Sequence, residues 1–172
     1  DFFGISAERV AHVVVENALL AHYDFAEQFK TAPKEGWKVV AGITMFTAHD
    51  AKKIQAQIDQ AQLLVEAVNQ CRTLANMPPS DLKPEGMAEA ARAAAAACRP
   101  AKGGASPLTV TVFDEKKLKS EGMNAILAVG SGSSSPPRLI IMEYVGLPRV
   151  ASAKREGPLA FVGKGVTFDS GG

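Results

Sequence analysis

The sequence contains little cysteine, few aromatic residues and no excess of charge of either sign. Two of its 172 residues are cysteines, 6% are aromatic, and 19 basic residues against 18 acidic ones leave a formal net charge of +1. Two thiols are too few for a disulfide framework and fit a reducing compartment best. The balanced charge excludes a field strong enough to attract nucleic acid or an anionic membrane. We therefore expect a small molecule or another subunit as the partner.

Long apolar runs and metal-ligand spacings are also missing. The longest runs, such as Leu139–Met142, fall far below the roughly 20 residues that a membrane-spanning helix needs. Cys71 and Cys98 are widely separated and do not form the paired spacing of a zinc site. The chain has three histidines, without ligand spacing among them: His12, His22 and His49. We expect no membrane segment, and we expect the histidines to be surface or packing residues.

The composition is that of a globular protein, and the two ends do not resemble natural boundaries. Hydrophobic residues make up 47% of the chain, enough for one packed domain or for parts of two. The chain opens with Asp1 rather than Met and closes on Gly171 and Gly172, inside an expected loop. We interpret it as a section of a longer protein, which leaves a targeting peptide open.

The first half of the chain predicts two helices around one strand. Apolar residues at three- and four-residue steps predict a helix from Ser6 to about Phe29, with Ser6 as its cap. The β-branched run Trp37–Thr44 predicts a strand. From Ala51 to Leu74 a continuous apolar stripe predicts a helix of about six turns. Such a helix is long for a single globule and is expected to bridge two domains.

Prolines and an alanine-rich run predict where one helix ends and the next begins in residues 76–98. Pro78 and Pro79 cannot continue a helix, so the long helix should end before them. Pro84 is placed at a helix start, and the alanine-rich stretch Met87–Cys98 has very high helix propensity. Because alanine allows close approach, we expect this helix to pack on a sheet.

The remaining elements alternate between strands and helices. Asp114 should cap a short helix over Asp114–Glu121, and Gly122 should end it. Four apolar runs predict strands: Leu108–Phe113, Ala125–Val129, Arg138–Val145 and Leu159–Gly163. Interleaved strands and helices predict an α/β sheet that is covered on both faces.

The last predicted strand runs directly into a polar loop that could carry chemistry. Chemistry in open α/β sheets gathers at such strand ends. Lys164 stands between Gly163 and Gly165, and Asp169 follows at a spacing that can bring both side chains to one point. A salt bridge between Lys164 and Asp169 is the simplest interpretation. A metal site is the alternative.

Two stretches near this loop have features of anion-binding sites. A phosphate loop requires four residues between its first glycine and its Gly-Lys pair, and Ser or Thr after the lysine. Here five residues separate Gly157 from Gly163, and Gly165 follows Lys164. The spacing excludes that motif. The run Gly130–Ser135 could cradle an anion, but a flexible turn before two prolines is favoured.

The segment Val162–Gly172, VGKGVTFDSGG, closely resembles the strand-end signature of the leucyl aminopeptidase family. Three further stretches resemble that family in the expected order: Asn76–Pro79 (NMPP), Ala128–Ser133 (AVGSGS) and Arg138–Gly146 with Glu143 and Tyr144. The resemblance covers roughly residues 52–172, and Leu19–Lys30 is similar to the end of the family's amino-terminal domain.

The resemblance implies a fold and a division into domains. Residues 1–50 would be the end of an amino-terminal α/β domain, and residues 51–75 a long linker helix. Residues 76–172 would be the first part of a mixed-sheet α/β catalytic domain, which the chain contains only in part.

The resemblance also implies a two-metal aminopeptidase that removes the amino-terminal residue from peptides with a free amino terminus. Lys164 would bind a metal ion through its side-chain amine, and Asp169 would bridge two divalent ions, Zn²⁺ or Mn²⁺ first, with Mg²⁺ or Co²⁺ as alternatives. An amine binds a cation only when neutral, a form that burial and a nearby dication favour, while the same ions favour the charged carboxylate. A cytoplasmic hexamer is the implied assembly.

The family's other catalytic residues lie downstream of this signature, so no catalytic residue beyond the two ligands is assigned within the chain. Lys164 and Asp169 alone would leave two dications short of ligands, and a sheet cut after its fourth strand would expose an edge. We expect the 172 residues alone to be inactive. The alternative function is a non-catalytic assembly or binding protein that retains the fold, and Glu143 is expected to be structural.

Overall fold

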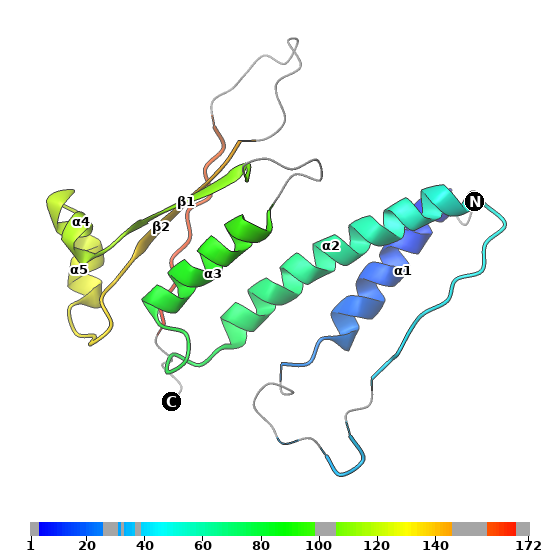
Figure 1. Ribbon diagram of the computed structural model, residues 1–172, viewed down its shortest axis with the longest axis horizontal. Helices are drawn as coiled ribbons and strands as arrows, with labels where there is room; N and C mark the ends of the chain where they lie inside the picture. Colours follow the sequence, from blue (N-terminus) through cyan, green and yellow to red (C-terminus); the bar gives the residue numbers. More distant parts are fainter. Residues whose placement is uncertain are drawn as a thin grey trace. The chain divides into compact units, whose positions relative to one another are not determined.

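The computed structural model describes residues 4–25, 31, 33–36, 39–98, 106–145 and 158–167. The chain divides into two compact units, Asp1–Asn76 and Met77–Gly172, and each is described by itself (Figure 1). Helices and a small antiparallel sheet place the chain in the α/β class, as predicted. In the described ranges, no helix is both long and apolar enough to cross a membrane.

Two packed helices form the first unit. Helix α1 (Ala7–His22) runs alongside helix α2 (Ala51–Asn76), as Figure 1 shows in blue and cyan-green. The hydroxyl of Ser6 accepts a hydrogen bond from the Arg9 N–H at 3.2 Å, so the predicted cap is confirmed. The buried apolar residues of the pair follow the three- and four-residue steps of a helix: Ala11, Val15, Ile54, Ala61 and Val65.

Polar contacts fasten the carboxyl-terminal end of α1 to α2. Arg72 donates a hydrogen bond to the carbonyl of Leu20 at 2.8 Å, and its guanidinium carbon lies 4.0 Å from the centroid of the Tyr23 ring. The hydroxyls of Tyr23 and Thr73 are 3.0 Å apart. Helix α1 ends at these contacts: Tyr23, the residue that follows it, adopts an extended backbone conformation. The helix predicted to reach Phe29 is therefore confirmed only as far as His22, and Phe29 lies outside the described residues.

The strand predicted at Trp37–Thr44 is wrong for its described part. Residues 39–44 belong to no helix or strand, and positions 37 and 38 lie outside the described residues. A strand requires a hydrogen-bonded neighbour, and no described segment pairs with these residues. Within the described part of the chain, one backbone group of this stretch has a partner: the Val40 N–H donates to His22 Nε2 at 2.9 Å.

Helix α3 and a two-stranded sheet form the centre of the second unit. Strand β1 (Leu108–Phe113) pairs antiparallel with β2 (Leu139–Tyr144), with Leu108 opposite Tyr144. The alanine-rich helix α3 (Pro84–Ala97) packs against both strands, which confirms its predicted place on a sheet and its start at Pro84.

Two predicted strands of this unit are wrong. Residues Ala125–Val129 belong instead to helix α5 (Asn124–Gly130), since a short apolar run does not by itself distinguish a buried strand from a helix. Residues Leu159–Gly163 form no strand, and Phe161 is 90% exposed. Without a pairing segment, the apolar character of this run is not enough to make it a strand.

The short helix predicted after β1 is confirmed as α4 (Glu115–Ser120). Asp114 caps it by accepting a hydrogen bond from the Lys117 N–H at 2.8 Å. Gly122 ends the turn with φ of 67°, in the left-handed region that favours glycine. Leu118 is completely buried and anchors the helix.

An ion-paired cluster joins α3 to the start of β2. Arg138 Nε donates to one oxygen of Glu85 at 2.6 Å, and Arg92 Nη1 donates to the other oxygen at 3.3 Å. The Arg138 hydrogen bond, reinforced by that of Arg92, holds the pKa of Glu85 below its ordinary value. Arg138 also donates to the carbonyls of Pro136 and Pro137, at 3.2 and 3.1 Å.

Candidate functional site

The described part of the signature is an exposed segment without regular secondary structure. Residues 158–167 belong to no helix or strand, and Lys164 is exposed. Its ammonium makes no hydrogen bond or ion pair with the rest of the described chain. Asp169 lies outside the described residues, so the geometry of the Lys164 and Asp169 pair stays a prediction.

The glycines that flank Lys164 lie in open surroundings. A Cβ atom added to Gly163 or Gly165 would meet no atom within 4 Å, and neither residue has a φ in the left-handed region. No close neighbour in the described residues therefore requires glycine here. Both glycines leave Lys164 accessible to a partner of its amine.

A complete metal centre is absent from the described residues. They contain no group of three or more His, Cys, Asp or Glu side chains that could hold a metal ion. The amine of Lys164 and the carboxylate of Asp169 are suitable metal donors. Two donors are not enough, because protein metal sites use three or four ligands. Lys164 and Asp169 therefore fit as a partial ligand set, which further residues must complete.

The serine-rich run after α5 is a closed turn. The Ser131 hydroxyl donates to the carbonyl of Ala128 at 2.8 Å, the Ser133 N–H donates to the carbonyl of Gly130 at 3.1 Å, and the Ser135 N–H donates to the Ser133 hydroxyl at 3.0 Å. These groups satisfy one another, so the turn interpretation fits better than an anion cradle.

One requirement in this turn was missed by the sequence reasoning. A Cβ atom on Gly130 would lie 2.7 Å from a ring carbon of Pro137, so only glycine allows the helix end to approach the proline. The sequence did contain a signal for this requirement: Gly130 ends an apolar run, and a Pro-Pro pair follows it.

The three histidines do not converge on one point. His12 is buried with Nε2 3.5 Å from a Glu16 oxygen, and its Nδ1 has no partner in the described chain. His22 accepts the Val40 N–H, and His49 lies in another loop. Their placement agrees with the expected packing and surface roles.

Glu143 lies on β2 opposite Thr109 and is exposed. Its main-chain carbonyl accepts a hydrogen bond from the Thr109 hydroxyl at 3.4 Å. No described His, Cys, Asp or Glu gathers with its carboxylate into a group that could bind a metal. Glu143 is thus a sheet residue in this structure.

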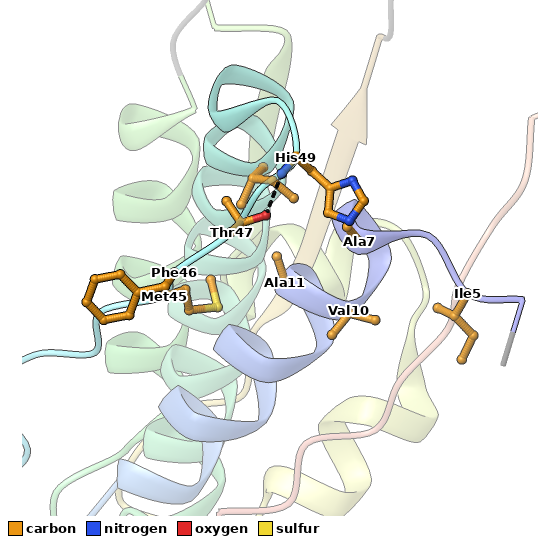
Figure 2. A pocket seen from close by; sticks show the side chains of 9 residues that line it. Ile5, Ala7, Val10, Ala11, Met45, Phe46, Thr47 and His49 are labelled. Atoms are coloured by element: carbon orange, nitrogen blue, oxygen red, sulfur yellow. Dashed lines mark hydrogen bonds between the residues drawn. The ribbon is translucent and has the colours of Figure 1, made fainter. Parts of the chain in front are cut away.

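Two shallow cavities occur in the first unit, each of about 360 Å³. The first is mainly apolar, and Figure 2 shows Val10 and Ala11 of α1 on one side and Met45 and Phe46 on the other. Among the described residues that line it, the polar side chains are Thr47 and His49. The second is lined partly by polar groups, among them His22, Glu66 and Asn69. Neither holds a described cluster of metal-binding side chains.

Comparison with known proteins gives consistent matches. The family model described as "Cytosol aminopeptidase family, catalytic domain" matches residues 69–172. A "probable cytosol aminopeptidase" of Syntrophotalea carbinolica is 37% identical over 98% of this chain and 32% of its own length. One of Rhodopirellula baltica is 44% identical over 67% of this chain and 20% of its own length. The chain spans about a third of the length of the relatives that it matches over nearly all of its residues.

Solved structures support the same fold. The bottromycin maturation enzyme BotP in complex with Mn superposes with a TM-score of 0.62 over 81% of this chain and 26% of that protein, at 24% identity. A second structure of BotP gives a TM-score of 0.58 at 25% identity. The chain therefore shares its fold with part of BotP at low sequence identity. The match of the family model over residues 69–172, with the 37% identity to the relative from Syntrophotalea carbinolica, shows that the chain belongs to the cytosol aminopeptidase family.

Proposed function

We propose that this chain is part of a metal-dependent aminopeptidase of the leucyl aminopeptidase type, in which Lys164 and Asp169 are metal ligands. The observation that carries the proposal is the match of the family's catalytic-domain model to residues 69–172, a range that includes both side chains. The substrates are peptides with a free amino terminus, and the reaction is hydrolysis of the first peptide bond.

Lys164 contributes a nitrogen donor. Its amine has no competing partner in the described chain, so a metal ion would not first have to break an ion pair seen there. Coordination requires the neutral amine, and a neighbouring dication favours that form. The open surroundings of Gly163 and Gly165 leave room for the ligand to reorient.

Asp169 contributes a carboxylate whose two oxygens can bridge neighbouring ions. It stays charged near physiological pH because its ordinary pKa is about 4 and dications favour the charged form. When bound, two divalent ions polarise a scissile carbonyl and lower the pKa of a water molecule. Zn²⁺ or Mn²⁺ is proposed first, with Mg²⁺ or Co²⁺ as alternatives. The rest of the ligand set comes from outside these 172 residues, so the chain alone is inactive.

The proposed organisation follows the same family. Residues 1–50 end an amino-terminal domain, residues 51–75 form the linker helix, and residues 76–172 begin the catalytic domain. The separation of two compact units after Asn76 supports the last boundary. A cytoplasmic hexamer is proposed, and the name cytosol aminopeptidase given to the relatives supports the location.

The test is hydrolysis of an amino-acid anilide by the full-length protein. Lys164→Ala should lower kcat/KM by more than about 100-fold, since even the loss of a residue that supports a ligand costs 10- to 100-fold. Lys119→Ala is the matched control, because Lys119 is an exposed lysine paired only with Glu115 in the described chain. Full activity of Lys164→Ala would refute the assignment. A folded wild-type protein without activity at any of the four metals would support the non-catalytic alternative.

A further inference from the structure

The carboxyl-terminal end of α2 has little of what normally stabilises a helix end. The buried residues of α2 end at Val65, and every residue from 66 to 76 is at least partly exposed. The last turn contains no basic residue, which would favour the helix dipole. Pro78 and Pro79 follow soon after and carry no N–H, so neither can cap the final carbonyls. The stability of this helix end therefore has to come from side-chain contacts.

Tyr23 supplies such contacts from the end of α1. Its hydroxyl lies 3.0 Å from the hydroxyl of Thr73 and 3.5 Å from Asn76 Nδ2. The guanidinium carbon of Arg72 lies 4.0 Å from the centroid of its ring. Arg72 and Thr73 are four and three residues before Asn76, so the three residues share one face of α2. One tyrosine thus contacts that face along the whole last turn.

Arg72 is itself held in place by two hydrogen bonds. Its Nη1 donates to the carbonyl of Leu20 at 2.8 Å and to Asn69 Oδ1 at 3.0 Å. Leu20 belongs to the last turn of α1, where carbonyls have no later helical N–H as a partner. A side chain near the end of α2 therefore satisfies a carbonyl at the end of α1, while Tyr23 contacts α2 in return. The two helix ends stabilise each other.

The two sides of this contact belong to different parts of the family match. The catalytic-domain model begins at residue 69, so the α2 residues of the contact lie within the match, whereas Leu20 and Tyr23 lie before it. In the structure, residues 69–76 are nevertheless part of the first compact unit, which ends at Asn76. The first residues of the catalytic-domain sequence are thus packed on a helix that precedes that domain.

We propose that Tyr23 and Arg72 form a clamp through which the amino-terminal unit keeps residues 69–76 helical up to the boundary between the units. Tyr23 is the positioning residue of this clamp, because its ring and its hydroxyl both contact α2. Without the clamp, the end of α2 frays, while the buried part of the helix, Ile54–Val65, stays packed on α1. The proposal uses contacts within the first unit and does not depend on the metal site.

Hydrogen exchange of the full-length protein tests the clamp. Tyr23→Phe removes the hydroxyl and keeps the ring beneath Arg72. The amides of residues 73–76 should then exchange at least about fivefold faster, the factor expected for the loss of one hydrogen bond of typical strength. The amides of residues 58–65 should keep their wild-type rates. Tyr144→Phe is the matched control, because Tyr144 is 66% exposed on β2 and should affect neither segment.

Two results of this experiment would overturn the proposal. Unchanged exchange of residues 73–76 in Tyr23→Phe would show that the hydroxyl does not hold the helix end. Equal acceleration of residues 58–65 would show a general loss of packing between the helices in place of fraying at one end.

A double-mutant cycle with Thr73→Val tests the hydroxyl pair directly. If both substitutions remove the same hydrogen bond, adding Thr73→Val to Tyr23→Phe should change the protection of residues 74–76 by less than about twofold. Each single variant should lower that protection by a similar factor. Effects that multiply in the double variant would show that the two hydroxyls act independently, and would overturn the role given to Tyr23.

Discussion

Arg138 donates a 2.6 Å hydrogen bond to Glu85 and so joins the start of β2 to the first turn of α3. Its side chain is 17% exposed, whereas that of Arg92, the second partner of Glu85, is 51% exposed. Arg138 also binds two carbonyls before β2. The less exposed arginine thus has more partners.

Arg138→Ala is expected to destabilise the protein more than Arg92→Ala. The first substitution removes two hydrogen bonds to main-chain carbonyls, each contributing on the order of 1 kcal/mol, in addition to the ion pair. The second removes one exposed ion pair, a kind that contributes little. Urea denaturation of both variants measures the difference, and equal midpoints would contradict the proposed anchoring role of Arg138.

The Glu85 pair predicts a loss of stability in acid. The Arg138 hydrogen bond, and then that of Arg92, lower the pKa of Glu85 from 4.5, so the folded state favours the charged carboxylate. The stabilisation is complete above the unfolded pKa and disappears as the pH falls through the lower, folded pKa. The difference in stability between wild type and Glu85→Gln should therefore be largest near neutral pH. It should shrink progressively as the pH falls below about 4.5. Denaturation curves over this range would contradict the account if the difference stayed constant.

Gly130→Ala is expected to destabilise the protein by about 1–3 kcal/mol, the range for overpacked sites. The new methyl group would meet the rigid Pro137 ring, with contacts of 2.7, 2.8 and 3.0 Å. Gly132→Ala is the matched control, because its Cβ would meet nothing within 4 Å. Thermal unfolding should show a lowered midpoint for the first variant alone. Similar midpoints would show that the turn can move away from the proline.

His12→Leu is expected to leave stability unchanged or to raise it. His12 is 7% exposed, and its Nδ1 has no partner in the described residues. A leucine of similar size removes an unsatisfied polar atom, whose burial costs about 1–3 kcal/mol. His12→Ala, which leaves a cavity, should destabilise. Chemical denaturation of the two variants distinguishes packing from a polar role, and a large loss in His12→Leu would indicate an essential polar partner.

Local signals were sufficient where the deciding contacts lie within one element. Ser6 and Asp114 cap helices as predicted because a cap needs only the next three residues. The alanine-rich α3 and the strand β1 also follow from their own composition. Ala125–Val129 shows the limit, since a short apolar run fits a helix as well as a strand.

Sequence reasoning was insufficient where an outcome depends on a distant partner. Val39–Thr44 and Leu159–Gly163 have the composition of strands, but no described segment pairs with them. Lys164 and Asp169 were identified by their resemblance to a signature, not by spacing, and a spacing alone cannot show which other ligands join them. Gly130 was overlooked because its close neighbour, Pro137, is known only from the fold.

The metal content of the purified full-length protein tests the central claim most directly. Metal analysis of the wild type, of Asp169→Ala and of the control Asp81→Ala, which removes an exposed carboxylate, should be made after equal loading with Zn²⁺ or Mn²⁺. We predict two ions per active site in the wild type and in Asp81→Ala, and loss of at least one in Asp169→Ala. Equal metal content in all three proteins would contradict the assignment of Asp169 as a ligand.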